Sequence, residues 1–257
     1  MIAAGPIVLL RSLLFTLYLY AAMAAIALVL APPLALFGGR HRSIRAAQAW
    51  ARAAIWGVRI ICGTRYEIRG AERLPKGAAL VASKHQAMWE ALFLTTCFKE
   101  PAFVLKKELL SLPIFGWFAS RAEQLPVDRE EGASALKNLM RAGAKTAAQG
   151  RPIVIFPEGT RQRPGAKPDY KPGIAALYKS LALPCVPVAL NSGLYWATNG
   201  ILRWPGTIIV EVLEPIPPGL SREAFMAELE TRIETASNRL LGEGLIQTQG
   251  AARRAAA

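Results

Sequence analysis

One histidine and one carboxylate of this chain have the types and the spacing of a proton-transfer pair. His85 precedes Glu90 by five residues, where an apolar, strand-like run gives way to a helical pattern. Five residues along a helix turn through about 500°, so the two side chains cannot meet from positions inside a helix. We therefore expect His85 on the turn before the helix, from which its imidazole can donate one N–H to Glu90. The carboxylate would fix the tautomer of a general base, although this spacing alone also arises by chance.

A second candidate is the loop 156–161, with sequence FPEGTR, which directly follows another apolar run. Gly159 lets the backbone approach a ligand closely, the amides around Thr160 can form an anion-binding nest, and Arg161 offers a planar, charged fork for phosphate. We include Glu158 in this candidate substrate-binding loop, but expect it to orient the loop or the arginine rather than to touch an anion. A surface turn without function is the alternative on composition alone.

The histidines and cysteines exclude other kinds of chemistry. The chain has only two histidines, His41 and His85, so a multi-histidine metal site is impossible. The cysteines lack CxxC spacing, which supports neither a zinc site nor a disulfide framework. We expect no metal, and buried thiols in a reducing compartment at Cys62, Cys97 and Cys185.

The charge and hydropathy of the chain favour a lipid surface as its partner. Lys and Arg number 31 against 18 Asp and Glu, which leaves a net charge of +13 on a chain that is 53% hydrophobic. Proteins that bind single-stranded nucleic acid usually interleave basic residues with aromatic ones that stack on bases. The arginine clusters of this chain lack that pattern, so we expect no nucleic-acid partner. A non-catalytic protein that uses its positive charge to hold anionic membrane lipids is the alternative from another class.

Residues 12–31 form an apolar segment that can span or enter a bilayer. No charged residue lies between Arg11 and Arg40, and 20 residues of helix measure about 30 Å, the thickness of the hydrocarbon layer. A secretory signal peptide is the competing interpretation, but the apolar region is too long and lacks a clear cleavage site. We expect Pro32 and Pro33 to end this helix.

The residues that follow predict both the orientation of the chain and a second helix. Four arginines lie within about 20 residues after the segment and one lies before it, so the positive-inside rule puts the catalytic part on the cytoplasmic face. The pattern of residues 43–61 predicts a helix with arginines on one face. That helix either lies in the membrane interface or packs on the catalytic domain. The four arginines are Arg40, Arg42, Arg45 and Arg52.

From about residue 65 onward, short β-like runs alternate with helical patterns. This alternation predicts an α/β domain with a substantially parallel sheet. A final amphipathic helix is expected to stop at Gly242. We assign 1–62 to membrane-anchoring helices, 63–245 to a catalytic domain and 246–257 to a disordered tail. The expected strands are 66–69, 79–82, 102–105, 124–127, 152–156, 185–190 and 207–213, and the expected inner helices are 90–98, 132–149 and 174–181.

Four short blocks occur in a fixed order between about residues 60 and 215. They are the His-x4-acid pair at 85–90, a block that contains Lys106, Pro113, Gly116 and Arg129, the FPEGTR loop at 156–161, and the ValProVal run at 186–188. Together the blocks resemble those of the lysophosphatidic acid acyltransferase family, also called the 1-acylglycerol-3-phosphate acyltransferases. Four blocks in order are far more specific than any one of them.

The resemblance implies a mixed sheet flanked by helices, an N-terminal two-helix membrane element, and acyl transfer without an acyl-enzyme or a cofactor. The family's catalytic histidine falls on His85, and its phosphate-contacting cations fall on Lys106, Arg129 and Arg161. Lys107 is adjacent and stays open. The implied donor is acyl-CoA or acyl carrier protein. The implied acceptor is the 2-hydroxyl of lysophosphatidic acid, which gives phosphatidic acid in phospholipid biosynthesis.

Glu90 departs from the family pattern, because members usually carry Asp five residues after the histidine. The longer arm can still reach the imidazole, but the geometry and the preferred acceptor become open questions. The alternative is an acyltransferase of the same family that uses another lyso-lipid acceptor, such as lyso-ornithine lipid or a lysophospholipid. An acceptor without phosphate would make Arg129 and Arg161 dispensable.

Overall fold

The computed structural model describes residues 5–37, 39–128 and 131–256 and has one seven-stranded sheet at its centre. The strand order is β1-β7-β6-β2-β5-β3-β4, and all pairs are parallel except β6 with β7. The mixed, largely parallel sheet is confirmed, and each strand lies within two residues of its predicted range. The strands are β1 (Thr64–Arg69), β2 (Leu80–Ser83), β3 (Ala102–Lys106), β4 (Leu125–Val127), β5 (Ile153–Ile155), β6 (Cys185–Leu190) and β7 (Gly206–Val212).

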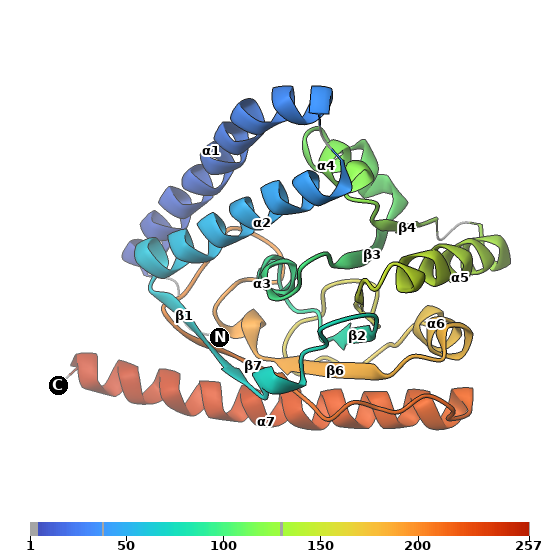
Figure 1. Cartoon of the computed structure of the whole chain (residues 1–257). Helices are drawn as coiled ribbons and strands as arrows, with labels where there is room; N and C mark the ends of the chain where they lie inside the picture. The colour runs from blue at the N-terminus through green and yellow to red at the C-terminus, as the bar shows by residue number, and fades with distance from the viewer. Residues whose placement is uncertain (1–4, 38, 129–130, 257) are drawn as a thin grey trace.

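Both faces of the sheet are buried, because alternate residues of each strand point to opposite sides. In β2, Leu80 and Ala82 pack with one helical layer, whereas Val81 packs with the other. The first layer consists of α5 (Ala133–Ala148), α6 (Gly173–Leu181) and α7 (Arg222–Ala256). The second consists of α3 (Trp89–Cys97), covered by α2 (Arg40–Gly57) and then α1 (Pro6–Phe37). Figure 1 shows α7 along one side of the molecule and the V of α1 and α2 on the other.

Helix α1 is the apolar segment expected from the sequence, but it is longer than predicted. It begins at Pro6 and continues through both prolines to Phe37, so the expected break at Pro32 and Pro33 is wrong. Proline removes a backbone donor but holds φ at a helical value, so the apolar residues on either side can continue the helix. Of the described residues, the 24 from Pro6 to Val29 form the one segment long and apolar enough to cross a membrane. Leu17 and other apolar side chains of this segment are exposed, which supports membrane association.

Helix α2 packs on the catalytic domain, which is one of the two alternatives that the sequence left open. One face, which includes Ile44, Ala51 and Ala54, is buried against the catalytic domain and α1, whereas Arg45 and Arg52 on the other face are exposed. The helix begins at Arg40, three residues earlier than expected, and ends in a π-helical turn, Val58–Cys62.

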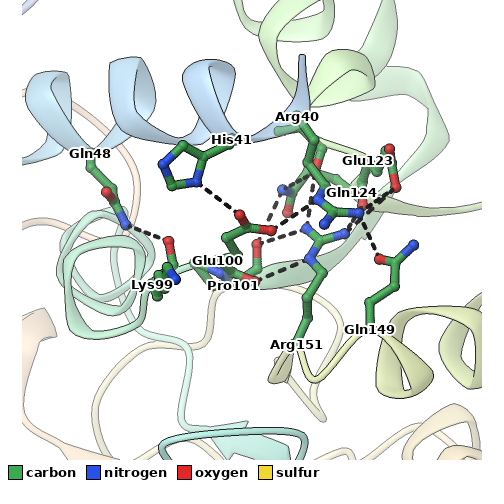
Figure 2. A network of polar contacts seen from close by, with 11 residues as sticks. Arg40, His41, Gln48, Lys99, Glu100, Pro101, Glu123, Gln124, Gln149 and Arg151 are labelled. Carbon is green, nitrogen blue, oxygen red and sulfur yellow. Dashed lines mark hydrogen bonds and ion pairs between the residues drawn. The ribbon is translucent and has the colours of Figure 1, made fainter.

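The start of α2 is attached to the domain by polar contacts. Figure 2 shows Arg40 and His41 turned toward Glu100, with Oε2 and Oε1 of that carboxylate 2.9 and 2.8 Å from Arg40 Nε and His41 Nδ1. Two turns further along α2, Gln48 donates to the carbonyl oxygen of Phe98 at 2.8 Å. Arg151, below them, donates to backbone carbonyls that include those of Glu100 and Ala122. Glu100, Ala122 and Arg151 shortly precede β3, β4 and β5, so α2 is attached at the amino ends of these strands.

The remaining helices show two further differences from the sequence predictions. Helix α4 (Phe115–Arg121) was not predicted, and α7 continues to Ala256, so the expected stop at Gly242 is wrong. A glycine inside a helix lowers helix stability by about 1 kcal/mol relative to alanine, which is too little to end a helix whose neighbouring residues pack on the domain. A Cβ on Gly244 would lie 2.5 Å from Leu194 Cδ1, so α7 passes closely over the domain there. Short 3-10 turns complete the fold at Ala71–Arg73, Lys107–Ser111 and Ser192–Leu194.

Candidate active site

The candidate catalytic residues follow the carboxyl ends of three neighbouring strands. His85 comes after β2, Glu158 after β5 and Ser192 after β6, and these strands are adjacent in the order β6-β2-β5. Loops at the carboxyl ends of parallel strands meet at one edge of a sheet, which is where ligands bind in open α/β folds. The sheet therefore brings together residues that are far apart in the sequence.

His85 and Glu90 are in contact. His85 lies on the turn between β2 and α3, as its spacing predicted, and its Nδ1 is 2.9 Å from Glu90 Oε1. The same carboxylate oxygen accepts hydrogen bonds from the amides of Gln86 and Ala87 at 2.6 and 2.7 Å. An oxygen that receives these two N–H donors acts as an acceptor, so Nδ1–H donates and Nε2 is left for a substrate.

Glu90 is fully buried and both of its oxygens are used. Ser192 Oγ, 102 residues further along the chain, donates to Glu90 Oε2 at 2.7 Å. The longer glutamate arm therefore reaches the imidazole and crosses to the β6 loop as well. Because the amides of Gln86 and Ala87 are engaged with Glu90, they are not free to stabilise an oxyanion.

The FPEGTR loop is bound directly to the histidine turn. Phe156 stacks on the His85 ring with centroids 4.0 Å apart and planes at 16°. The amide of Gln162 donates to the carbonyl oxygen of His85 at 2.8 Å. The imidazole is thus held on one side by an aromatic ring and at Nδ1 by a carboxylate, and 14% of its side chain stays exposed.

Glu158 is the inner anchor of this loop. Its carboxylate accepts from Lys84 Nζ at 2.6 Å and from the His85 amide at 3.0 Å, and only 1% of the residue is exposed. Lys84 also pairs with Glu234 of α7 at 2.8 Å, and Tyr170 donates to the same Glu234 oxygen. Burial raises the pKa of Glu158 against the opposing charge of Lys84. Its position fits the orienting role predicted from the sequence and not a direct contact with a substrate.

The other predicted binding residues follow β5 and β3, two strands on the same side of β2 in the sheet. Thr160 and Arg161 are exposed and Gly159 is half-buried, with its amide bonded to the carbonyl oxygen of Phe156. Lys106 is exposed at the end of β3, beyond β5 from His85, whereas Lys107 pairs with Asp128 at 3.0 Å. The predicted phosphate contact Arg129 lies outside the described residues.

The cysteine thiols and the second histidine lie outside this site. Burial raises the pKa of the Cys62 thiol to about 11 and that of Cys97 to about 12. The second histidine, His41, is at the opposite edge of the sheet with Glu100. Among the residues that the structure describes, no group of three or more His, Cys, Asp or Glu side chains could hold a metal ion.

Sequence reasoning missed several residues that support the site. Lys84 stands directly before His85 at the end of a buried strand, and a lysine in that place was a visible signal of a buried partner. Ser192, Glu234 and Tyr170 carried no signal, because each reaches the site through tertiary packing from a distant segment.

Residues 65–191 match the Acyltransferase family, and they include the histidine turn, the FPEGTR loop and strand β6. The fold and the site thus define an acyltransferase. A 1-acyl-sn-glycerol-3-phosphate acyltransferase of Pseudomonas aeruginosa is 36% identical over 211 residues, which cover 82% of this chain and 81% of that protein. The protein of that name from Helicobacter pylori is 27% identical over 161 residues, 62% of this chain and 68% of its own. The chain belongs to the 1-acyl-sn-glycerol-3-phosphate acyltransferase family.

A solved structure gives independent support for the fold. The crystal structure of PlsC, the 1-acyl-sn-glycerophosphate acyltransferase from Thermotoga maritima, superposes with a TM-score of 0.71. The match covers 90% of this chain and 97% of that one at 20% sequence identity. The similarity therefore extends over nearly the whole chain.

Proposed function

We propose that this enzyme transfers an acyl group from acyl-CoA or acyl carrier protein to the 2-hydroxyl of 1-acylglycerol-3-phosphate, with phosphatidic acid as the product. The observation that carries the proposal is the His85–Glu90 pair, in which Nδ1 is occupied and Nε2 is available beside a loop that offers an arginine. The relatives with this activity in their names support the choice of acceptor. No cofactor or metal takes part in the proposed reaction.

The proposed mechanism uses His85 as a general base. Nε2 takes the proton of the acceptor hydroxyl while the hydroxyl oxygen attacks the thioester carbonyl carbon. Glu90 stabilises the imidazolium through the Nδ1–H bond. The tetrahedral intermediate then collapses, the C–S bond breaks, and the imidazolium returns its proton to the departing thiolate. No acyl-enzyme forms.

The acceptor presents a phosphate monoester, which needs cationic contacts in a site open to the membrane. We assign these contacts to Lys106, Arg129 and Arg161, and loop positioning to Gly159 and Thr160. The exposed apolar surface of α1 would bring the site to the bilayer where such lipids reside. Since four arginines follow the apolar segment 12–31 and only Arg11 precedes it, we propose that the catalytic domain faces the cytoplasm.

The test is a panel of acceptors and donors with the full-length enzyme in lipid nanodiscs. Lysophosphatidic acid, lyso-ornithine lipid and a lysophospholipid are each paired with labelled acyl-CoA and acyl carrier protein, with His85→Ala as the blank. We expect the highest kcat/KM with lysophosphatidic acid, and at least about 10³-fold less activity in the variant. Preference for an acceptor without a phosphate monoester would overturn the acceptor, and substantial activity of His85→Ala would overturn the mechanism.

A further inference from the structure

A cavity of about 180 Å³ lies between α1 and the segment that joins β6 to β7, beside the active-site turn. Its walls come from four distant parts of the chain. Thr16 and Tyr20 belong to α1, Met88 precedes α3, Trp196 follows β6, and Arg161 belongs to the FPEGTR loop. Arg203 completes the lining, so two arginines from separate segments share one small cavity.

Arg203 is buried to an extent that is unusual for an arginine, with 7% of the residue exposed. Its guanidinium lies over the Trp196 ring, 4.0 Å from the centroid, and its Nη1 donates to the carbonyl oxygens of Gly200 and Leu202. Nε has no hydrogen-bond partner among the described residues, and none of their carboxylates forms an ion pair with Arg203.

The surroundings of Arg203 make its positive charge unfavourable. Burial lowers the pKa of this guanidinium to about 10, and the nearby charge of Arg161 acts in the same direction. A buried charge without a counter-ion is costly, and removal from water strengthens its attraction for an anion. Two guanidinium groups at one cavity match the several acceptor oxygens of a phosphate group.

Arg203 is also attached to the apolar helix. Its amide donates to Ser12 Oγ of α1 at 2.9 Å, and Tyr20 at the cavity wall is largely exposed. The cavity therefore lies where the apolar helix α1 meets the catalytic domain. One of its lining residues, Met88, is only three residues after His85.

We propose that Arg203 and Arg161 together bind a phosphate group of a substrate in this cavity, with Arg203 as a specificity-determining residue. The inference rests on the proposed function for the identity of the substrate, and the phosphate belongs either to the acyl acceptor or to the CoA part of the donor. Lys106 follows β3, beyond β5, and does not line this cavity, so an acceptor phosphate bound here would contact Arg203 in place of Lys106.

The first measurement is the affinity of the full-length protein in detergent for glycerol 3-phosphate and inorganic phosphate, by isothermal titration calorimetry. Arg203→Met keeps the apolar stem and removes the charge, and Arg203→Lys keeps a charge without the fork. Arg163→Met, at an exposed arginine two residues after the FPEGTR loop, is the matched control. We expect Arg203→Met to raise Kd about 10-fold or more, Arg203→Lys to raise it several-fold, and the control to leave it unchanged.

The second measurement separates the two sources of the phosphate. A higher KM for the lyso-lipid at saturating donor assigns the site to the acceptor, and a higher KM for acyl-CoA at saturating acceptor assigns it to the donor. The effects of Arg161→Met and Arg203→Met should be non-additive, because both side chains contact one group.

An unchanged Kd in both Arg203 variants would overturn the proposal, and if Arg203→Met fails to fold, an unchanged Kd in Arg203→Lys does so alone. A raised Kd with both KM values unchanged would overturn the assignment to a substrate. Binding needs no turnover, so these results are distinct from failure of the proposed function, which appears as a lack of acyl transfer by the wild-type enzyme.

Discussion

Two polar networks lie at opposite edges of the same sheet, and they differ in how deeply they are buried. At the carboxyl edge, Lys84, Glu158 and Glu90 have side chains that are 2%, 0% and 0% exposed. At the amino edge, the Arg40 and Glu100 side chains are 28% and 18% exposed. The Lys84–Glu158 pair is therefore closed to water, whereas the Arg40–Glu100 pair at the other edge is partly open to it.

The difference separates a network that positions catalytic groups from one that attaches a helix. Charges removed from water interact strongly and allow little movement, so Lys84 and Glu158 hold the backbone of the histidine turn in place. Solvated charges interact weakly, so Arg40 and Glu100 orient the start of α2 at little gain in stability. The contribution of each ion pair to stability therefore depends more on its burial than on the distance between the two charged groups.

The largest effect is expected from Lys84→Met. This change leaves Glu158 buried without its cation, which costs about 3–5 kcal/mol of the free energy of unfolding. Denaturant unfolding in detergent measures it, and Lys107→Met, which breaks an exposed pair with Asp128, is the matched control. A loss in Lys84→Met no greater than in the control would contradict the distinction between the two edges.

The same variant makes a prediction for pH. Burial raises the pKa of Glu158, so its contribution to stability is complete below the ordinary pKa of a carboxyl group and is lost as the pH rises through the raised value. The charge of Lys84 lowers the pKa of Glu158 against the effect of burial, and Lys84→Met removes that charge. The stability deficit of Lys84→Met relative to the wild type should therefore shrink on acidification from neutral pH, and a deficit that grows would reverse the assigned sign.

A smaller effect is expected from Glu90→Gln, which keeps the size of the side chain and removes its charge. The imidazolium loses its stabilising partner, so kcat should fall about 10²-fold with little change in the KM of the acceptor. Ser192→Ala, which removes only the bond to Oε2, should cost less. Initial-rate kinetics measure both, and a Glu90→Gln enzyme within a few-fold of the wild-type kcat would count against the role of the pair.

The smallest effect is expected at the amino edge, from Glu100→Gln. Burial opposes the ionisation of Glu100, but hydrogen bonds and charge from His41 and Arg40 outweigh it and lower the pKa of this carboxyl. Its stability contribution is present above the ordinary carboxyl pKa and is lost as the pH falls. We expect a loss of at most about 1 kcal/mol and an unchanged kcat. A large loss of activity would show that the edges are coupled.

The sequence by itself determined the sheet, the apolar helix and the first contact of the site. The seven strands were predictable because buried strands form short apolar runs between turns, and His85 met Glu90 because both lie within one local turn. The end of α1 and the extent of α7 were mispredicted, since proline and glycine lower the stability of a helix without deciding where packed helices end.

Only the tertiary structure decided what surrounds that first contact. Ser192 and Glu234 approach the histidine turn from segments more than 100 residues away, and no local pattern records such pairing. Arg203 likewise becomes a buried cation beside Arg161 because α1 closes over the segment after β6. The physical reason is the same in each case: hydrophobic periodicity encodes which residues are buried locally, whereas the partner of a buried charge depends on how the whole chain packs.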